Sequence, residues 1–267
     1  MAKTLFVIAL ILMAPAGWAA TLSGGTFFSA SQDFGGSIGV LSASAAFSNN
    51  DVAGVNTLQI VLTNTATTQV TSNPQILGVL MFDVINDANG SVATFALTPS
   101  TAFLTAGSTY VDSDTGLVTT CGGACDVASN WFYAGAGSGQ ALPDGGNPVG
   151  ASRAIAGVSW GSLVGSGATN FAGNTLGNAD GPAYGIVGAG GVNTSNSIVP
   201  VIFDSATFRF TFLDSAFGGA FHITNLAWLY GTGPGEPVLT PEPMHVGVAL
   251  SLALMIFAVW RRRRTAE

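Results

Sequence analysis

The stretch from 206 to 213, ATFRFTFL, constrains the fold of this chain more than any other segment. Its three phenylalanines alternate with Thr207, Arg209 and Thr211, so the aromatic rings share one face of an extended chain. A period of two is the pattern of a half-buried β-strand. The segment therefore predicts a strand whose apolar face needs a second sheet to cover it.

Six further apolar runs are short and rich in β-branched and aromatic residues. Turn-forming pairs such as Asn89-Gly90 and Gly218-Gly219 lie between such runs. The runs span 57–65, 76–84, 91–98, 154–160, 197–204 and 220–232. Many short strands and no helical pattern predict that the main part of the chain is all-β, and we expect an antiparallel β-sandwich or jelly roll. The glycine-rich stretch 134–196 is expected to form long loops with a few short strands.

Residues 1–19 have the pattern of a secretory signal peptide. An apolar core follows Lys3, and Gly17 and Ala19 give the small-x-small character of a cleavage site. We expect the mature chain to begin near Ala20 and the protein to be exported.

A second apolar segment, 244–260, contains no formal charge. At about 1.5 Å per residue a helix of this length spans roughly 25 Å, at the short end for a membrane helix. Four arginines follow directly: Arg261, Arg262, Arg263 and Arg264. Because such clusters stay in the cytoplasm, we expect a precursor anchored in the cytoplasmic membrane, with the part of the chain between the two apolar segments outside the cytoplasm.

Pro241, Glu242 and Pro243 stand directly before this transmembrane segment. Proline disfavours helix, so the stretch 231–243 is expected to be extended and exposed near the membrane surface. A Pro-Glu-Pro triplet, one apolar helix and a terminal arginine cluster together resemble the PEP-CTERM sorting signal. The resemblance implies that an exosortase, a membrane enzyme of Gram-negative bacteria, processes the chain. The chain is then divided into a signal peptide at 1–19, a passenger at 20–237 and a sorting signal at 238–267.

The passenger also resembles recurrent passengers of that family. They often carry an L-x-x-x-L-T-N-T strand, here 58–65, and then a strand ending in Phe-Asp, here Phe82-Asp83. They often end near a Tyr-Gly-Thr, here 230–232. The resemblance implies an exosortase-dependent surface protein without known enzymatic activity. It also implies a link to exopolysaccharide and biofilm, because the family's genes are associated with that production.

The charge of the passenger excludes one class of partner. Two arginines oppose eleven aspartates and Glu236, which gives a net charge of −10. Such a surface cannot neutralise a phosphate backbone, so nucleic acid is not expected as a partner. The mature passenger also contains no lysine, so if an exosortase attaches it covalently, the attachment is expected to run through the new C-terminus.

Cys121 and Cys125 are the only cysteines, and the two glycines between them permit a tight bend. In an exported chain this pair predicts a local disulfide. A redox-active pair is the alternative, but the spacing is not C-x-x-C and no thioredoxin-like pattern surrounds it.

Two features offer binding chemistry. The cluster at 130–135 contains Trp131 and Tyr133, which are the best candidates for stacking on a sugar, although such rings are more often core residues. The loops at 83–91 and 111–116 carry oxygen donors suited to calcium, but neither completes an EF-hand pattern. We interpret these loops as Asx turns and expect no cofactor.

His222 is the single histidine of the passenger and lies within an apparent strand. We interpret it as a surface or satisfied polar residue, and no G-x-S-x-G elbow accompanies it. The sequence therefore predicts a secreted surface or extracellular-matrix protein with a structural or adhesive role, and no enzyme. A carbohydrate-binding module is the first alternative, and a secreted hydrolase is the second.

Overall fold

The computed structural model describes residues 20–24, 26–52, 55–93, 97–111, 118–120, 125–135, 149–157, 160, 169–171, 185–191, 201–213, 219–231 and 237–241. Within these ranges the chain forms β-strands and two short 3₁₀ turns, η1 (Asn73–Gln75) and η2 (Ala128–Asn130), and no α-helix. Across these same ranges no helical segment has the length and apolarity to cross a bilayer. The predicted signal peptide at 1–19 and the predicted membrane helix at 244–260 lie outside the described residues.

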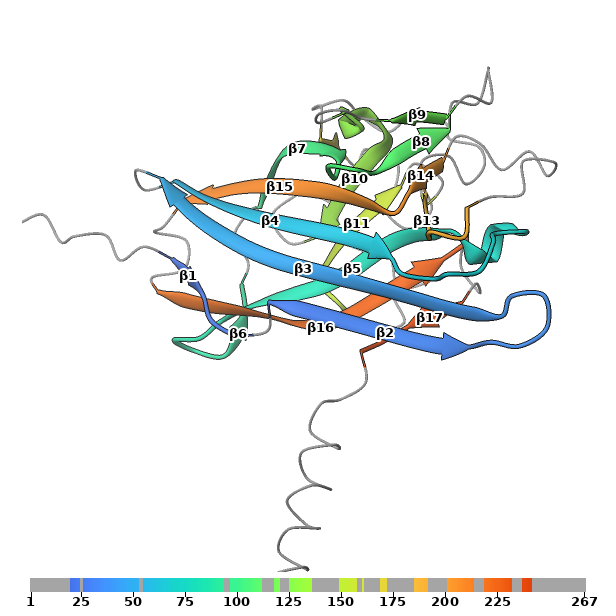
Figure 1. The fold of residues 1–267 in the computed structure, drawn as a ribbon. Coiled ribbons are helices and arrows are strands. Elements are labelled where there is room, and N and C mark those ends of the chain that lie inside the picture. Colours follow the sequence, from blue (N-terminus) through green and yellow to red (C-terminus); the bar gives the residue numbers. More distant parts are fainter. Residues whose placement is uncertain are drawn as a thin grey trace, which may run out of the picture.

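One of the two sheets is antiparallel throughout and contains five strands (Figure 1). In spatial order they are β2 (Phe27–Asp33), β3 (Val40–Val52), β4 (Val55–Asn64), β15 (Ser205–Leu213) and β7 (Thr98–Leu104). β15 contains the alternating stretch, and the strand predicted there is confirmed. Phe208 and Phe210 are fully buried, whereas Arg209 between them is exposed.

The second sheet is built around β5 (Leu77–Asn86), which lies between β11 (Arg153–Gly157) and β16 (Ala220–Tyr230). Its other strands are β1 (Thr21–Leu22), β6 (Ser91–Val92), β8 (Thr109–Val111), β9 (Val118–Thr120), β10 (Trp131–Gly135), β12 (Thr169–Asn170), β13 (Ile186–Val187), β14 (Val201–Phe203) and β17 (Val238–Leu239). Most pairings are antiparallel, but β1 with β16 and β13 with β14 are parallel. The β-rich, two-sheet architecture is therefore confirmed, and the expectation of purely antiparallel sheets is wrong for this sheet. The side-chain pattern along a strand does not encode the direction of its neighbour.

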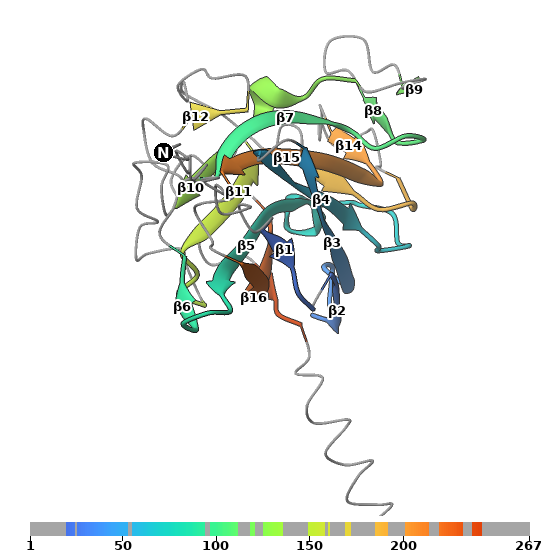
Figure 2. The ribbon, with the colours of Figure 1, turned by 90° about the vertical axis from the view of Figure 1, so that its left-hand side faces the viewer.

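Aromatic side chains join the two sheets where β10 and β11 of the second sheet lie beside β15 of the first (Figure 2). The rings of Trp131 on β10 and Phe208 on β15 lie 4.8 Å apart between centroids, and those of Tyr133 and Phe210 lie 5.0 Å apart. Phe171 contacts both phenylalanines, at 5.4 and 5.1 Å. Because residues two apart on a strand share a face, one face of β10 meets one face of β15 along its length.

β17 carries the second sheet beyond 237, where the passenger was expected to end. Val238 pairs with Leu229 of β16, and Leu239 pairs with Trp228. This part of 231–243 is extended, as predicted, but the prediction that it is exposed is wrong at Leu239, which is only 1% exposed. An apolar side chain beside an open strand edge is buried against the core, and this burial outweighs the turn-forming character of the flanking residues.

Gly78 on β5 lies so close to Trp160 that no side chain fits between them. A Cβ at Gly78 would lie 2.2 Å from Nε1 and 2.7 Å from Cδ1 of Trp160. The indole is fully buried, and its N–H donates to the carbonyl oxygen of Gly231 at 3.0 Å. The ring is therefore held in place against β5 and cannot easily give way.

We predict that Gly78→Ala lowers the free energy of unfolding by about 1–3 kcal/mol, the usual cost of overpacking a core. Chemical denaturation of the passenger measures this cost. In a Trp160→Leu background the ring is gone, so the same substitution should cost less. Equal costs in both backgrounds would contradict the close contact with the indole.

Candidate functional site

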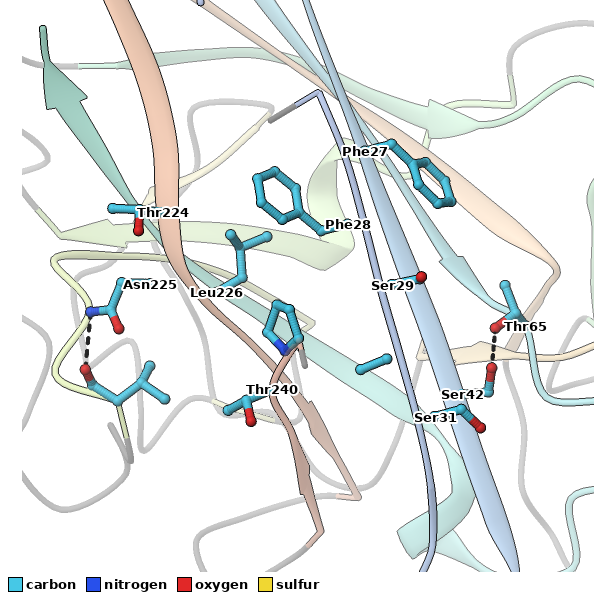
Figure 3. A pocket seen from close by; sticks show the side chains of 13 residues that line it. Phe27, Phe28, Ser29, Ser31, Ser42, Thr65, Thr224, Asn225, Leu226 and Thr240 are labelled. Carbon is cyan, nitrogen blue, oxygen red and sulfur yellow. Dashed lines mark hydrogen bonds between the residues drawn. The ribbon is translucent and has the colours of Figure 1, made fainter. Parts of the chain in front are cut away.

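A groove of about 1000 Å³ lies between the edge strand β2 and the middle of β16 (Figure 3). The side chains of Phe28 and Leu226 point into the space between these strands, whereas Phe27 points to the other side of β2. None of the described residues that line the groove carries a charge. The groove therefore combines apolar side chains with the small hydroxyl side chains of serine and threonine.

The groove exists because two strands cover only the ends of β16. β1 pairs with β16 at Ala220 and Phe221, and β17 pairs with it at Trp228 and Leu229. In the described part of the chain, no strand covers the outer side of the segment between these pairings. The ladder between β16 and β5 is irregular in the same segment, between Thr224 and Ala227.

Asn225 occupies this irregularity with a φ of 53°, in the left-handed region that asparagine tolerates better than most residues. Its side-chain amide donates to Oδ2 of Asp83 and to the carbonyl oxygen of Val149, both at 3.0 Å. The other carboxylate oxygen of Asp83 accepts the backbone N–H of Ser152 at 2.6 Å. These bonds fix the β16 side of the groove to the segment at 149–152.

The predicted sorting triplet begins at this groove. Thr240 and Pro241 line it, directly after β17. Glu242, Pro243 and the arginines at 261–264 lie outside the described residues. Only the first residue of the triplet is thus placed, at the border of the folded body.

The aromatic cluster at 130–135 is a core element, which corrects the sugar-contact candidates. Trp131, Phe132 and Tyr133 are each at most 2% exposed. Trp131 and Tyr133 face the rings of β15, so neither can stack on a sugar in this structure. The alternative interpretation of these rings as core residues is the correct one.

Arg153 is a buried cation that the sequence did not single out. Its side chain is fully buried on β11, where Nη2 donates to the carbonyl oxygen of Ala93 at 2.6 Å and Nη1 to Oγ of Ser152 at 3.1 Å. Burial raises the pKa of the neighbouring Tyr133 to about 12, although the charge of Arg153 acts in the opposite direction. Tyr133 is therefore a neutral phenol at ordinary pH.

His222 forms a surface cluster with Asp87 and Ser23. Its Nδ1 lies 2.5 Å from Oδ1 of Asp87, and the hydroxyl of Ser23 donates to Oδ2 of the same carboxylate. The carboxylate thus stands between the serine and the histidine. An activated serine needs the imidazole itself as its base, so this is not the geometry of a hydrolase triad. The interpretation of His222 as a satisfied surface residue is confirmed.

The loop at 83–91 forms the Asx turns expected from its sequence. Oδ1 of Asn86 accepts the N–H of Ala88 at 2.9 Å, and Oδ1 of Asn89 accepts the N–H of Ser91 at 3.0 Å. The second candidate loop, at 111–116, lies almost wholly outside the described residues. No group of three or more metal-ligating side chains occurs in the part of the chain that is described.

Comparisons with protein-family models, with curated proteins and with solved structures found no match.

The cluster of Ser23, Asp87 and His222 predicts a small pH dependence of stability. The hydrogen bond from Ser23, followed by that from His222, lowers the pKa of Asp87 from its ordinary 3.8. A lowered folded-state pKa stabilises the protein above 3.8 and ceases to do so as pH falls through the lower value. Asp87→Asn should therefore cost less than about 1 kcal/mol at neutral pH, because the pair is at the surface.

Acid titration of unfolding free energy tests this, since the difference between wild type and Asp87→Asn should disappear well below pH 3.8. Ser23→Ala should give a smaller pH-dependent contribution than wild type, because it removes the main cause of the shift. A difference that persists unchanged at low pH would show that Asp87 acts through its shape and not its charge.

Proposed function

We propose that this chain is an exported surface or extracellular-matrix protein of a Gram-negative bacterium, with a structural or adhesive role and no catalytic one. Residues 238–267 act as a sorting signal of the PEP-CTERM kind. An exosortase recognises the triplet of Pro241, Glu242 and Pro243. The arginines at 261–264 hold the precursor in the inner membrane until it is processed and delivered to the surface or matrix.

The observation that carries this proposal is that the triplet begins only two residues after the last strand of the described chain. β17 ends at Leu239, and Pro241 is the second residue after it. Leu239 is buried in the main core cluster, which also contains Trp131 and Phe208, and Pro241 borders an open groove. A cut on the C-terminal side of the triplet would therefore leave the core packing of β17 untouched. That is a requirement for a passenger that has to remain folded after release.

The proposed environment is an exopolysaccharide matrix. This part rests on the family resemblance and on the composition of the passenger, which is rich in serine, threonine and asparagine and has a net charge of −10. Neutral hydroxyl and amide groups can hydrogen-bond to polysaccharide at many points without a dedicated site. Because Trp131 and Tyr133 are buried, the structure offers no aromatic platform at that position for a carbohydrate-binding module.

We predict that changing Pro241, Glu242 and Pro243 together to alanine blocks processing. Alanine is the best helix former, so the substitutions allow a helix at 244–260 to extend toward the passenger, and they remove the carboxylate. The passenger should then stay cell-bound as an uncut precursor. A tag placed after Ala20 reports its size and cell fraction.

The matched control replaces Arg261, Arg262, Arg263 and Arg264 with serine and leaves the triplet intact. This variant should lose retention in the membrane and process slowly, because the cytoplasmic anchor is gone. Processing of the triplet variant at the wild-type rate would make the triplet incidental and reduce the tail to an anchor.

We also propose that Cys121 and Cys125 form a local disulfide. Cys121 lies outside the described residues. The carbonyl oxygen of Cys125 accepts the N–H of Leu104 of β7 at 2.9 Å, and its half-buried side chain packs against the main core. One end of the short loop is thereby fixed to the sheet, and export brings the pair into an oxidising space.

Thiol labelling of the denatured mature protein should find both cysteines oxidised. Their joint replacement by serine should lower the free energy of unfolding by roughly 2 kcal/mol or less, because so short a loop loses little entropy on closure. Two thiols that label freely in newly exported protein would refute the pairing.

A further inference from the structure

The outer edge of β2 presents backbone hydrogen-bonding groups that have no partner in the described part of the chain. β2 pairs with β3 alone and ends the five-stranded sheet. The N–H of Phe47 donates to the carbonyl oxygen of Thr26 at 2.7 Å, and with the register this assigns the even-numbered residues of β2 to the β3 ladder. In an antiparallel pair the intervening residues turn their N–H and C=O groups the other way. Those of Phe27, Ser29 and Ser31 are therefore directed outward.

The opposite edge of the same sheet is protected. β7 contains Pro99, and Asp126 forms a bridge with Phe103. On either side of that bridge, the N–H of Leu104 and the C=O of Ala102 bond to the neighbouring segment at 125–127, both at 2.9 Å. Proline and coverage of this kind are the usual means of blocking a free edge. β2 has neither proline nor a charged side chain between Phe27 and Gln32.

We infer that β2 is a self-association edge, through which a second copy of this chain pairs antiparallel with the first. Charge favours this edge over the rest of the surface. The passenger carries a net charge of −10, so two copies repel each other in most orientations. The first six residues of β2 are uncharged, and Asp33 lies at the far end of the strand. An antiparallel pair sends the two copies of Asp33 to opposite ends of the interface.

A two-fold axis at Ser29 pairs the outward backbone groups of the two copies and also places compatible side chains opposite each other. It places Phe27 opposite Ser31 of the second copy, and Phe28 opposite its Ala30. Phe28 and Ala30 are half-buried and line the groove, so the same pairing covers an apolar part of the groove in both copies. The two Asp33 residues end up about 27 Å apart at roughly 3.4 Å per residue, beyond the screening length of about 8 Å at physiological salt.

The proposed contact between the two β2 strands is small, so a method that detects weak association is needed. One strand pair buries less surface than the roughly 1,200–2,000 Å² of a standard stable interface. Association is therefore weak in dilute solution and increases where copies are concentrated at a membrane or in a matrix. The inference does not depend on how the C-terminal tail is processed, because β2 belongs to the passenger.

The test is disulfide trapping of the full chain in intact producing cells. In the proposed register Ser29 lies opposite itself in a hydrogen-bonded pair, with Cα atoms about 5.5 Å apart, which suits a disulfide. Ser29→Cys should therefore give a cross-linked dimer on a non-reducing gel. The matched control is Ser100→Cys, an exposed serine on β7 at the other edge of the same sheet. The chain without an added cysteine gives the background from Cys121 and Cys125.

A second variant tests whether the outward backbone hydrogen bonds of β2 hold the dimer together. Ser31→Pro in the Ser29→Cys chain removes an outward N–H from each copy and leaves the β3 ladder intact, so trapping should fall about tenfold. Dimers at Ser29 well above those at Ser100, reduced by the proline, support the inference. Equal trapping at both serines, or none at Ser29, overturns it, and so does trapping that the proline leaves unchanged. Loss of dimers on changing Pro241, Glu242 and Pro243 is not expected, which separates this test from that of the sorting signal.

Discussion

The contact between β10 and β15 is the constraint on which the rest of the fold depends. Trp131 and Tyr133 meet Phe208 and Phe210, and Phe171 packs against both phenylalanines. Large rings bury about 150–250 Å² each and dominate the energy of a core. Because this chain has few charged residues and many glycines, few other interactions can determine how the two sheets pack against each other. This aromatic layer therefore fixes which faces of the two sheets meet.

The passenger contains two arginines, and the fold places them in opposite environments, one exposed and one buried. Arg209 lies on the outer face of β15, where Nε donates to Oε1 of Gln59 at 3.0 Å and the guanidinium lies 4.7 Å from the ring centre of Phe103. Arg153 is fully buried and bonds to backbone and hydroxyl oxygens. One cation thus covers an aromatic surface in contact with solvent, and the other joins β11 to the segment at Ala93.

The strands were predicted best from the sequence where one face of the strand is exposed to solvent and the other is buried. β15 alternates in its second half, where Arg209 is exposed between two buried phenylalanines, whereas its first four residues, Thr207 among them, are all buried. β10 does not alternate, because it is covered on both faces: Trp131 and Tyr133 face β15, and Phe132 belongs to a second apolar cluster with Met81 and Trp160. A strand of that kind looks the same whether its rings bind a ligand or fill a core. The burial of Arg153, the parallel pairings and the groove depend on which distant segments meet, and no local pattern records that.

β17 is the last described strand before the tail, and its geometry decides how a pulling force would enter the passenger. It is joined to β16 by only two residue pairs, with Leu239 as its buried anchor. Tension applied at Pro241 would pass through Leu239 to β16 and from there to β5, which β16 accompanies along nearly its whole length. The short ladder of β17 would yield first and lengthen the tether by a few residues, while the long β16–β5 ladder still carried the load. The passenger would thus lengthen at its C-terminal end under tension before its long strands began to separate.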